Sequence, residues 1–146
     1  MEILKVDTEK RRIGNVGEKM AARYLFFHGY RILEKNLVID GREIDIVARR
    51  GDTLAFIEVK TRSVDKLDPH EARPASSVTP EKQRKIITAA AQYKGMNYSR
   101  CEGLRIRFDV IEVLLEKKNN RYKRRAINHL TAAFDKDTAY RRPWEK

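Results

Sequence analysis

The chain has 146 residues, of which 36% are charged and 41% hydrophobic, with 32 Lys and Arg against 21 Asp and Glu. This length predicts a single domain, residues 1–146, that is long enough to bury a sizeable core. The formal net charge of +11 favours an anionic partner, with nucleic acid as the first candidate. No stretch is long and apolar enough to span a bilayer, so we expect no membrane partner.

The cysteine and histidine content argues against disulfides and zinc sites. Cys101 is the single cysteine of the sequence, which excludes an internal disulfide and fits a reducing cytoplasm. The three histidines, His28, His70 and His129, show no zinc-ligand spacing. The start of the chain, residues 1–5, lacks the apolar core of a signal peptide, so we expect a cytoplasmic location.

The first half of the chain predicts a helix followed by three strands. Thr8 or Asp7 can cap a helix that runs to about His28, with Gly29 ending it. Three alternating runs follow, at about residues 30–39, 42–49 and 53–61. Asp40-Gly41 is a strong hairpin turn between the first two runs.

The second half predicts a loop, a helix, a strand and a last helix. Residues 62–80 hold three prolines and little periodicity, so we expect a long mobile loop there. Thr79-Pro80 predicts the start of a helix that Gly95 closes. A long strand is expected at residues 104–115 and a charged turn at 117–125. A last amphipathic helix is expected to carry Ile127, Leu130, Thr131 and Phe134.

Two short motifs on the second and third predicted strands indicate a metal site. They are Glu43-Ile44-Asp45 and Glu58-Val59-Lys60. If Gly51-Asp52 is a two-residue hairpin loop, Arg50 pairs with Thr53 and Asp45 lies directly opposite Glu58. Opposed residues share a face with Cβ atoms about 5 Å apart, which suits two carboxylates that hold one Mg²⁺ or Mn²⁺. Lys60 on the same face can orient or deprotonate a water and bind phosphate.

The alternative interpretation is that these charges form the solvated face of an antiparallel sheet. That interpretation predicts polar neighbours, yet Val47, Leu54 and Phe56 share the face, and the opposite face is also apolar. Strands covered on both sides rarely bury carboxylates unless these are paired or bind metal. The pattern therefore favours a metal site and leaves a structural ion-pair cluster open.

The order of motifs along the chain resembles a known family. The matching segments are Gly17-Glu18, Glu43-Ile44-Asp45, Glu58-Val59-Lys60-Thr61-Arg62, Val78-Thr79-Pro80-Glu81-Lys82-Gln83 and Arg107-Phe108-Asp109-Val110. In this order the chain resembles the YraN-like family of small uncharacterised bacterial proteins and the PD-(D/E)xK nuclease superfamily. The resemblance extends more loosely to archaeal-type Holliday junction resolvases. One departure is Arg42, which stands where the family usually has a glycine.

The resemblance implies a fold and roles for individual residues. The implied fold is α/β, a restriction-endonuclease-like αβββαβ core with a mixed four-stranded (or slightly larger) sheet flanked by helices. Asp45 and Glu58 match the two metal-binding acids, Lys60 matches the catalytic lysine, and Glu18 matches a first-helix acid that supports the metal. Lys82 and Gln83 match a second-helix motif that reaches toward phosphate. Solvated charges on helix surfaces remain the alternative for Glu18 and Lys82.

The implied activity is a Mg²⁺- or Mn²⁺-dependent DNA endonuclease, and the looser resemblance to junction resolvases leaves selectivity for DNA structure open. Further residues expected to contact nucleic acid are Arg62, Arg84 and Lys85, because they flank the motifs with positive charge. The alternative is a non-catalytic nucleic-acid-binding or scaffold protein on a nuclease-like fold. An RNA partner, a homo-oligomer and the structure of the substrate stay open at this point.

Overall fold

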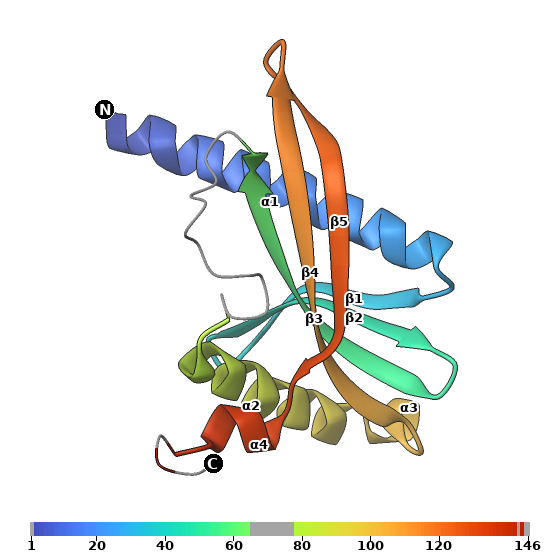
Figure 1. Ribbon diagram of the computed structural model, residues 1–146. Helices are drawn as coiled ribbons and strands as arrows, with labels where there is room; N and C mark the ends of the chain where they lie inside the picture. The colour runs from blue at the N-terminus through green and yellow to red at the C-terminus, as the bar shows by residue number, and fades with distance from the viewer. Residues whose placement is uncertain (1, 65–77, 143, 145–146) are drawn as a thin grey trace.

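The computed structural model describes residues 2–64, 78–142 and 144, with side chains from Thr8 onward. In these parts the elements are, in chain order, α1 (Glu2–Phe27), β1 (Arg31–Ile39), β2 (Arg42–Arg50), β3 (Thr53–Ser63), α2 (Pro80–Met96), α3 (Tyr98–Cys101), β4 (Arg105–Lys118), β5 (Arg121–Phe134) and α4 (Lys136–Tyr140) (Figure 1). The predicted α/β class and the helix, three-strand, helix, strand order are confirmed. The core of the loop predicted at 62–80, residues 65–77, lies outside the described residues.

One mixed five-stranded sheet organises the molecule, in the order β1-β2-β3-β4-β5. The first three strands form an antiparallel meander, β3 and β4 run parallel, and β5 returns antiparallel to β4. The turns follow the expected chemistry, because Asp40 and Gly41 both have positive φ and Arg50 pairs with Thr53. The α2 segment connects the parallel pair, as a crossover must.

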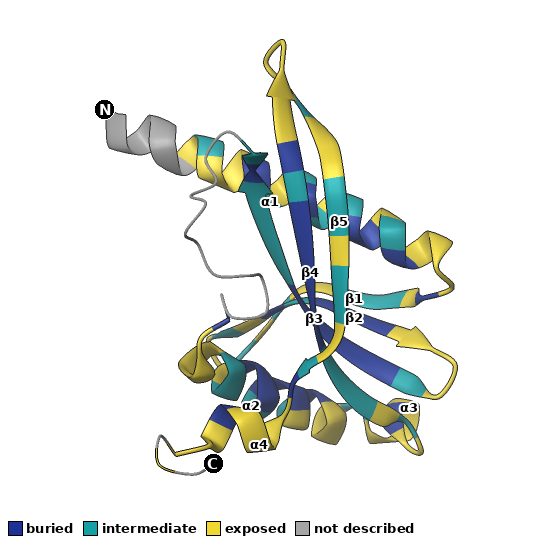
Figure 2. Ribbon diagram, in the orientation of Figure 1, coloured by how far each residue is buried: buried dark blue, intermediate teal, exposed yellow. Residues whose placement is uncertain are grey.

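Helices cover both faces of the sheet, with α1 on one face and α2 and α4 on the other (Figure 1). The core on the α1 side includes Leu25, Ile46 and Ile57, and the core on the α2 side includes Phe56, Ile86 and Tyr93. Burial on both faces explains why β2 and β3 carry near-continuous apolar runs (Figure 2). The two strands with the acidic motifs are therefore central, as the sequence indicated.

Two sequence predictions for the C-terminal part of the chain are wrong. The helix predicted around Ile127, Leu130, Thr131 and Phe134 is the strand β5, and it pairs with β4 through two register shifts. These shifts break the strict alternation of a strand, so the apolar spacing resembles a helix. The predicted charged turn is a two-residue turn at Asn119 and Asn120, both with positive φ.

The ends of the helices also differ from the prediction. The first helix begins at Glu2 rather than at a cap on Asp7 or Thr8, because residues 2–7 contain no glycine or proline that would stop it. The second helix passes through Gly95 and ends at Met96. Its N-terminus is as predicted, since Thr79 Oγ1 accepts a hydrogen bond from the Lys82 backbone N–H. Among the described helices, none has the length and apolarity needed to cross a membrane.

Candidate active site

The site lies where the pairing of β2 and β3 stops. The last paired residues are Ile46 and Ile57, one step before Asp45 and Glu58. In place of a ladder bond, Asp45 Oδ2 accepts a hydrogen bond of 2.7 Å from the Val59 backbone N–H. The carboxylate of Asp45 thus closes the gap between the two strands. The predicted register of the hairpin of β2 and β3 is correct. Directly after its last backbone pair, the Asp45 side chain takes the place of a backbone hydrogen-bond acceptor.

Glu58 points toward α2 from the centre of the sheet. It follows Leu54 and Phe56 on the face that packs against α2, and only 4% of its surface is exposed. Lys82 on the first turn of α2 places its Nζ 2.6 Å from Glu58 Oε1. The buried charge of Glu58 is therefore paired with a lysine that comes from a distant part of the chain. The sequence offered a solvated surface lysine as the alternative for Lys82, and the structure instead brings it to the acidic cluster.

Lys60 lies on the same face as Glu58, two residues further along β3. Its Nζ is 3.8 Å from Glu58 Oε1, which is a longer contact than that of Lys82. The parallel register places Lys60 beside Glu112 of β4, and Glu112 is 94% buried. Asn128 of β5 donates a hydrogen bond of 3.4 Å to Glu112.

Sequence reasoning missed Glu112 as a member of this group. A signal was present, because Glu112 interrupts the apolar run Val110 to Val113 in a buried strand. Its position next to Lys60 depends on the register between β3 and β4. That register joins segments about fifty residues apart, and no local pattern specifies it.

Gly17 brings the first helix close to β3 and so positions Glu18. A Cβ atom on Gly17 would lie 1.8 Å from Thr61 Oγ1, so only glycine permits this approach. Glu18 then lines a cavity of about 240 Å³ together with Asp45 and Asn36. Glu18 and Asp45 therefore line the same cavity.

The electrostatics of the carboxylates favour a bound cation. Burial, together with the negative charge of Glu58, raises the pKa of Asp45 to about 8. Burial also raises the pKa of Glu18, and the charges of Glu43 and Glu58 add to the effect. For Lys82, burial alone would lower the pKa, but the hydrogen bond and charge of Glu58 outweigh burial and raise it. Burial is thus the largest cause of the two raised carboxyl pKa values, and the neighbouring carboxylates add to it.

The donor set fits a hard divalent ion with several waters. Among the described residues, no three His, Cys, Asp or Glu side chains converge to form a complete preformed metal centre. Asp45 and Glu58, with Glu18 in the cavity that Asp45 lines, are nevertheless a common kind of protein contribution to a Mg²⁺ site, because Mg²⁺ usually keeps several waters and takes substrate phosphate oxygens. The Nζ of Lys82 occupies the position of a cation against Glu58. The chemistry of these donors is compatible with Mg²⁺ or Mn²⁺, which Asp45 and Glu58 would hold with Glu18 in support.

The residues predicted to bind nucleic acid are not all at this site. Gln83 donates to the Val78 carbonyl at 2.9 Å, and Arg84 donates to the Ala139 carbonyl at 2.8 Å. Lys85 pairs with Glu81 on the exposed side of α2. Arg62 lines a cavity of about 530 Å³ that also borders Lys60 and Glu18. The structure thus groups Lys60, Lys82 and Arg62 near the acids and directs Arg84 and Lys85 elsewhere.

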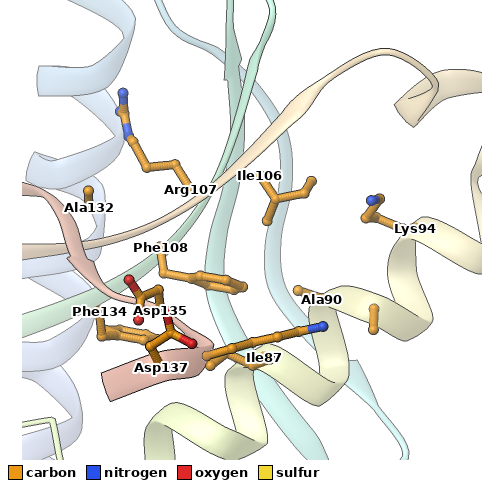
Figure 3. A pocket seen from close by; sticks show the side chains of 12 residues that line it. Ile87, Ala90, Lys94, Ile106, Arg107, Phe108, Ala132, Phe134, Asp135 and Asp137 are labelled. Atoms are coloured by element: carbon orange, nitrogen blue, oxygen red, sulfur yellow. The ribbon is translucent and has the colours of Figure 1, made fainter. Parts of the chain in front are cut away.

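Two further features, a buried hydrogen-bond network and a cavity, lie apart from the site of Asp45 and Glu58. On the α1 face, the buried Asp109 accepts hydrogen bonds from Arg107 at 2.8 Å and 2.9 Å and contacts His129 Nε2 at 2.8 Å. These partners lower the pKa of Asp109 although burial acts to raise it. A separate cavity of about 520 Å³ opens between α2, β4 and α4, with Phe108 and Phe134 in its wall (Figure 3). Neither feature shares a lining residue with the acidic site.

The chain belongs to the uncharacterised protein family UPF0102, whose family model matches residues 17–113. The matched range begins at Gly17 and includes every residue of the acidic site. This finding confirms the resemblance to the YraN-like family that the motifs indicated.

Similar proteins from several bacteria carry the same family description. A UPF0102 protein of Chlorobium phaeobacteroides is 42% identical over 132 residues, which cover 88% of this chain and 98% of the relative. One from Chlorobaculum parvum is 46% identical over 127 residues, 84% of this chain and 91% of the relative. A third, from Syntrophus aciditrophicus, is 42% identical over 114 residues, 78% and 85% of the two chains. None of these names states an activity.

Proposed function

We propose that this protein is a Mg²⁺- or Mn²⁺-dependent DNA endonuclease that hydrolyses phosphodiester bonds. The observation that supports the proposal most directly is the group formed by Asp45, Glu58 and Lys60 at the point where β2 and β3 separate. Asp45 carries a pKa raised to about 8 by burial and by Glu58, and Lys60 lies 3.8 Å from Glu58. The resemblance of the motifs to PD-(D/E)xK nucleases supports the same chemistry.

In the proposed reaction the side chains would hold a metal ion, orient the attacking water and neutralise charge on the phosphate. A divalent ion bound by Asp45 and Glu58 would activate water and stabilise charge on the phosphate. Lys60 would orient the attacking water and contact a phosphate oxygen from its place beside Glu58. Lys82, whose Nζ lies 2.6 Å from Glu58 Oε1, would exchange this carboxylate for a phosphate oxygen when the substrate binds. Glu18 would support the site from the helix that Gly17 holds against β3.

The net charge of +11 supports a nucleic-acid substrate, since phosphate contacts provide most of the sequence-independent affinity of DNA-binding proteins. We expect shape or backbone recognition rather than base reading. The cytoplasm is the proposed location.

A direct test is incubation with linear duplex, single-stranded, flapped and four-way DNA in Mg²⁺, Mn²⁺ or EDTA. Wild type should cleave at least one of these with metal and none in EDTA. Asp45→Asn, Glu58→Gln and Lys60→Met should each lose at least about 100-fold in rate, the scale of removing one key catalytic group. Arg105→Gln, at the opposite end of the sheet, should retain activity. Cleavage that persists in Asp45→Asn would disprove the assignment of the site.

The second candidate function is a nucleic-acid-binding or scaffold protein without turnover. Lys60 and Lys82 both contact Glu58, and such an arrangement also satisfies a purely structural ion-pair cluster. This candidate predicts DNA binding without cleavage in any metal. It also predicts that Asp45→Asn leaves divalent-metal binding unchanged.

A further inference from the structure

The hairpin of β4 and β5 extends beyond the rest of the sheet. Strands β4 and β5 remain paired up to Lys118 and Arg121, whereas the pairing of β3 with β4 ends at Ser63 and Leu115. Among the described residues, no third strand therefore lies beside residues 116–125, the ribbon tip. Figure 1 shows this hairpin standing clear of the end of β3. The tip is therefore a two-stranded ribbon, unlike the central strands, which have a neighbour on each side.

The ribbon tip is strongly basic and exposed. Its six cationic residues are Lys117, Lys118, Arg121, Lys123, Arg124 and Arg125, and all are exposed (Figure 2). Its single acid, Glu116, pairs with Arg125 at 3.8 Å. A ribbon of this charge is strongly self-repelling, so it is expected to have an anionic partner.

One face of the ribbon tip is fixed against α1. The Tyr122 hydroxyl donates to Glu9 Oε1 at 2.7 Å, and Lys117 Nζ is 3.3 Å from the same oxygen. Arg12 lies over the Tyr122 ring at 5.9 Å. These contacts hold the ribbon tip in a defined orientation relative to the helix.

The other face carries three cations on the side of the active site. Glu112 of β4 lies beside Lys60 of β3 in the parallel register, so the two side chains share one face of the sheet. Side chains alternate along β4, which puts Lys118 on that face too. The partners across the ribbon place Arg121 opposite Lys118 and Lys123 opposite Glu116. Within the described part of the chain, Lys118, Arg121 and Lys123 form no ion pair with a carboxylate. Lys118 is six residues beyond the level of Lys60 on the sheet, which corresponds to about 20 Å at roughly 3.3 Å per residue.

We propose that the ribbon tip is an arm that lies in a groove of duplex DNA, with Lys118, Arg121 and Lys123 on its phosphates. The inference rests on the proposed function and names its substrate class, a duplex that extends to one side of the cleaved bond. A two-stranded β-ribbon fits the major groove, which is about 12 Å wide. The span of about 20 Å corresponds to roughly six base pairs at about 3.4 Å each. A single strand offers no groove for the same contact.

The test compares two triple variants of equal charge in binding assays. The arm variant is Lys118→Gln, Arg121→Gln and Lys123→Gln. The control variant is Lys94→Gln, Arg105→Gln and Lys136→Gln, whose positions are also exposed and lie on α2, the far end of β4 and α4. Affinity is measured by fluorescence anisotropy for a 20-base-pair duplex and the matching single strand, in EDTA, at several salt concentrations.

We expect the arm variant to lose duplex affinity on the order of 100-fold at about 0.1 M salt, with the salt slope reduced by about 2 to 3. The control should change the slope by less than about 1, and single-strand affinity should fall much less than duplex affinity in the arm variant. The arm proposal would be overturned by any of three results: equal losses of affinity in the two variants, equal losses for duplex and single strand in the arm variant, or no DNA binding by wild type. Cleavage is measured separately in the presence of metal. Loss of duplex affinity in the arm variant, with no cleavage by wild type, would refute only the nuclease proposal. Cleavage by wild type, with unchanged duplex affinity in the arm variant, would refute only the arm proposal.

Discussion

At the scale of single residues, Asp45 is an acid whose ionised form is unfavourable in the folded protein, and a bound metal ion should make that form favourable. Its pKa is raised to about 8 in the folded protein by burial and by Glu58, against about 3.9 in an unfolded chain. Between these values the folded state holds a proton that the unfolded state has lost. Stability without metal should therefore fall as pH rises from about 4 to about 8, by at most about 1.4 kcal/mol per pH unit.

Asp45→Asn should remove this pH dependence and raise the melting temperature at pH 7.5, because the amide oxygen can still accept from Val59. Thermal unfolding in EDTA at several pH values measures the effect. Asp40→Asn is the matched control, since Asp40 sits in an exposed turn with positive φ that Asn also adopts. A melting temperature that drops in Asp45→Asn would indicate a structural ion-pair cluster instead.

Under the proposed function Lys82 would compete with the metal for Glu58, because its Nζ lies 2.6 Å from the carboxylate. Lys82→Met keeps the length of the side chain and removes the charge. We expect Mn²⁺ to bind the free variant roughly 2- to 10-fold more tightly, the scale of a partly exposed ion pair, while cleavage slows. Calorimetric titration gives the affinity. The control is Lys85→Met. Lys85 lies about one helical turn from Lys82 and pairs with Glu81, so this variant should leave Mn²⁺ binding unchanged. Weaker Mn²⁺ binding in Lys82→Met would show that Lys82 supports the metal.

At the scale of elements, the sequence predicts local features well and long-range register poorly. The hairpins of β1, β2 and β3 follow from turn residues and alternation, so the opposition of Asp45 and Glu58 was within reach. The identity of β5 was not, because its bulges disturb the alternation and its pairing partner lies across a turn of two asparagines. Glu112 likewise gains Lys60 and Asn128 as neighbours only through the packing of β4 between β3 and β5. Asp109 has Arg107 on its own strand, but its contacts with His129 and Ala132 depend on the same packing.

The contact between α1 and β3 should depend on the absence of a side chain at Gly17. Gly17→Ala would place Cβ 1.8 Å from Thr61 Oγ1, and the overpacking should cost on the order of 1–3 kcal/mol. Gly14→Ala, one turn earlier on the same helix, has open space around its Cβ and should stabilise by up to about 1 kcal/mol. Urea unfolding followed by circular dichroism compares the two. Equal effects in both variants would mean that the close approach of the helix is not needed.

At the scale of the whole molecule, positive charge and the acidic site have separate tasks. The acids lie at the separation of two central strands, while the basic residues extend from Lys60 and Lys82 to the ribbon tip. Binding should therefore survive changes that stop cleavage. Under the proposed function, the net charge of +11 would attract phosphate toward the acidic site and offset the repulsion among its carboxylates.

This separation gives the last prediction, on the salt dependence of DNA binding. If about five phosphates are neutralised, log affinity should fall against log salt with a slope of roughly −4 to −5. Lys60→Ala removes one phosphate contact, so it should abolish cleavage and change the slope by at most about one unit. Asp45→Asn should abolish cleavage and leave the slope unchanged, since it removes no cation. Anisotropy titrations in EDTA measure the slopes. An affinity independent of salt would mean that the basic surface serves another partner, and the nuclease proposal would then depend on the acidic site alone.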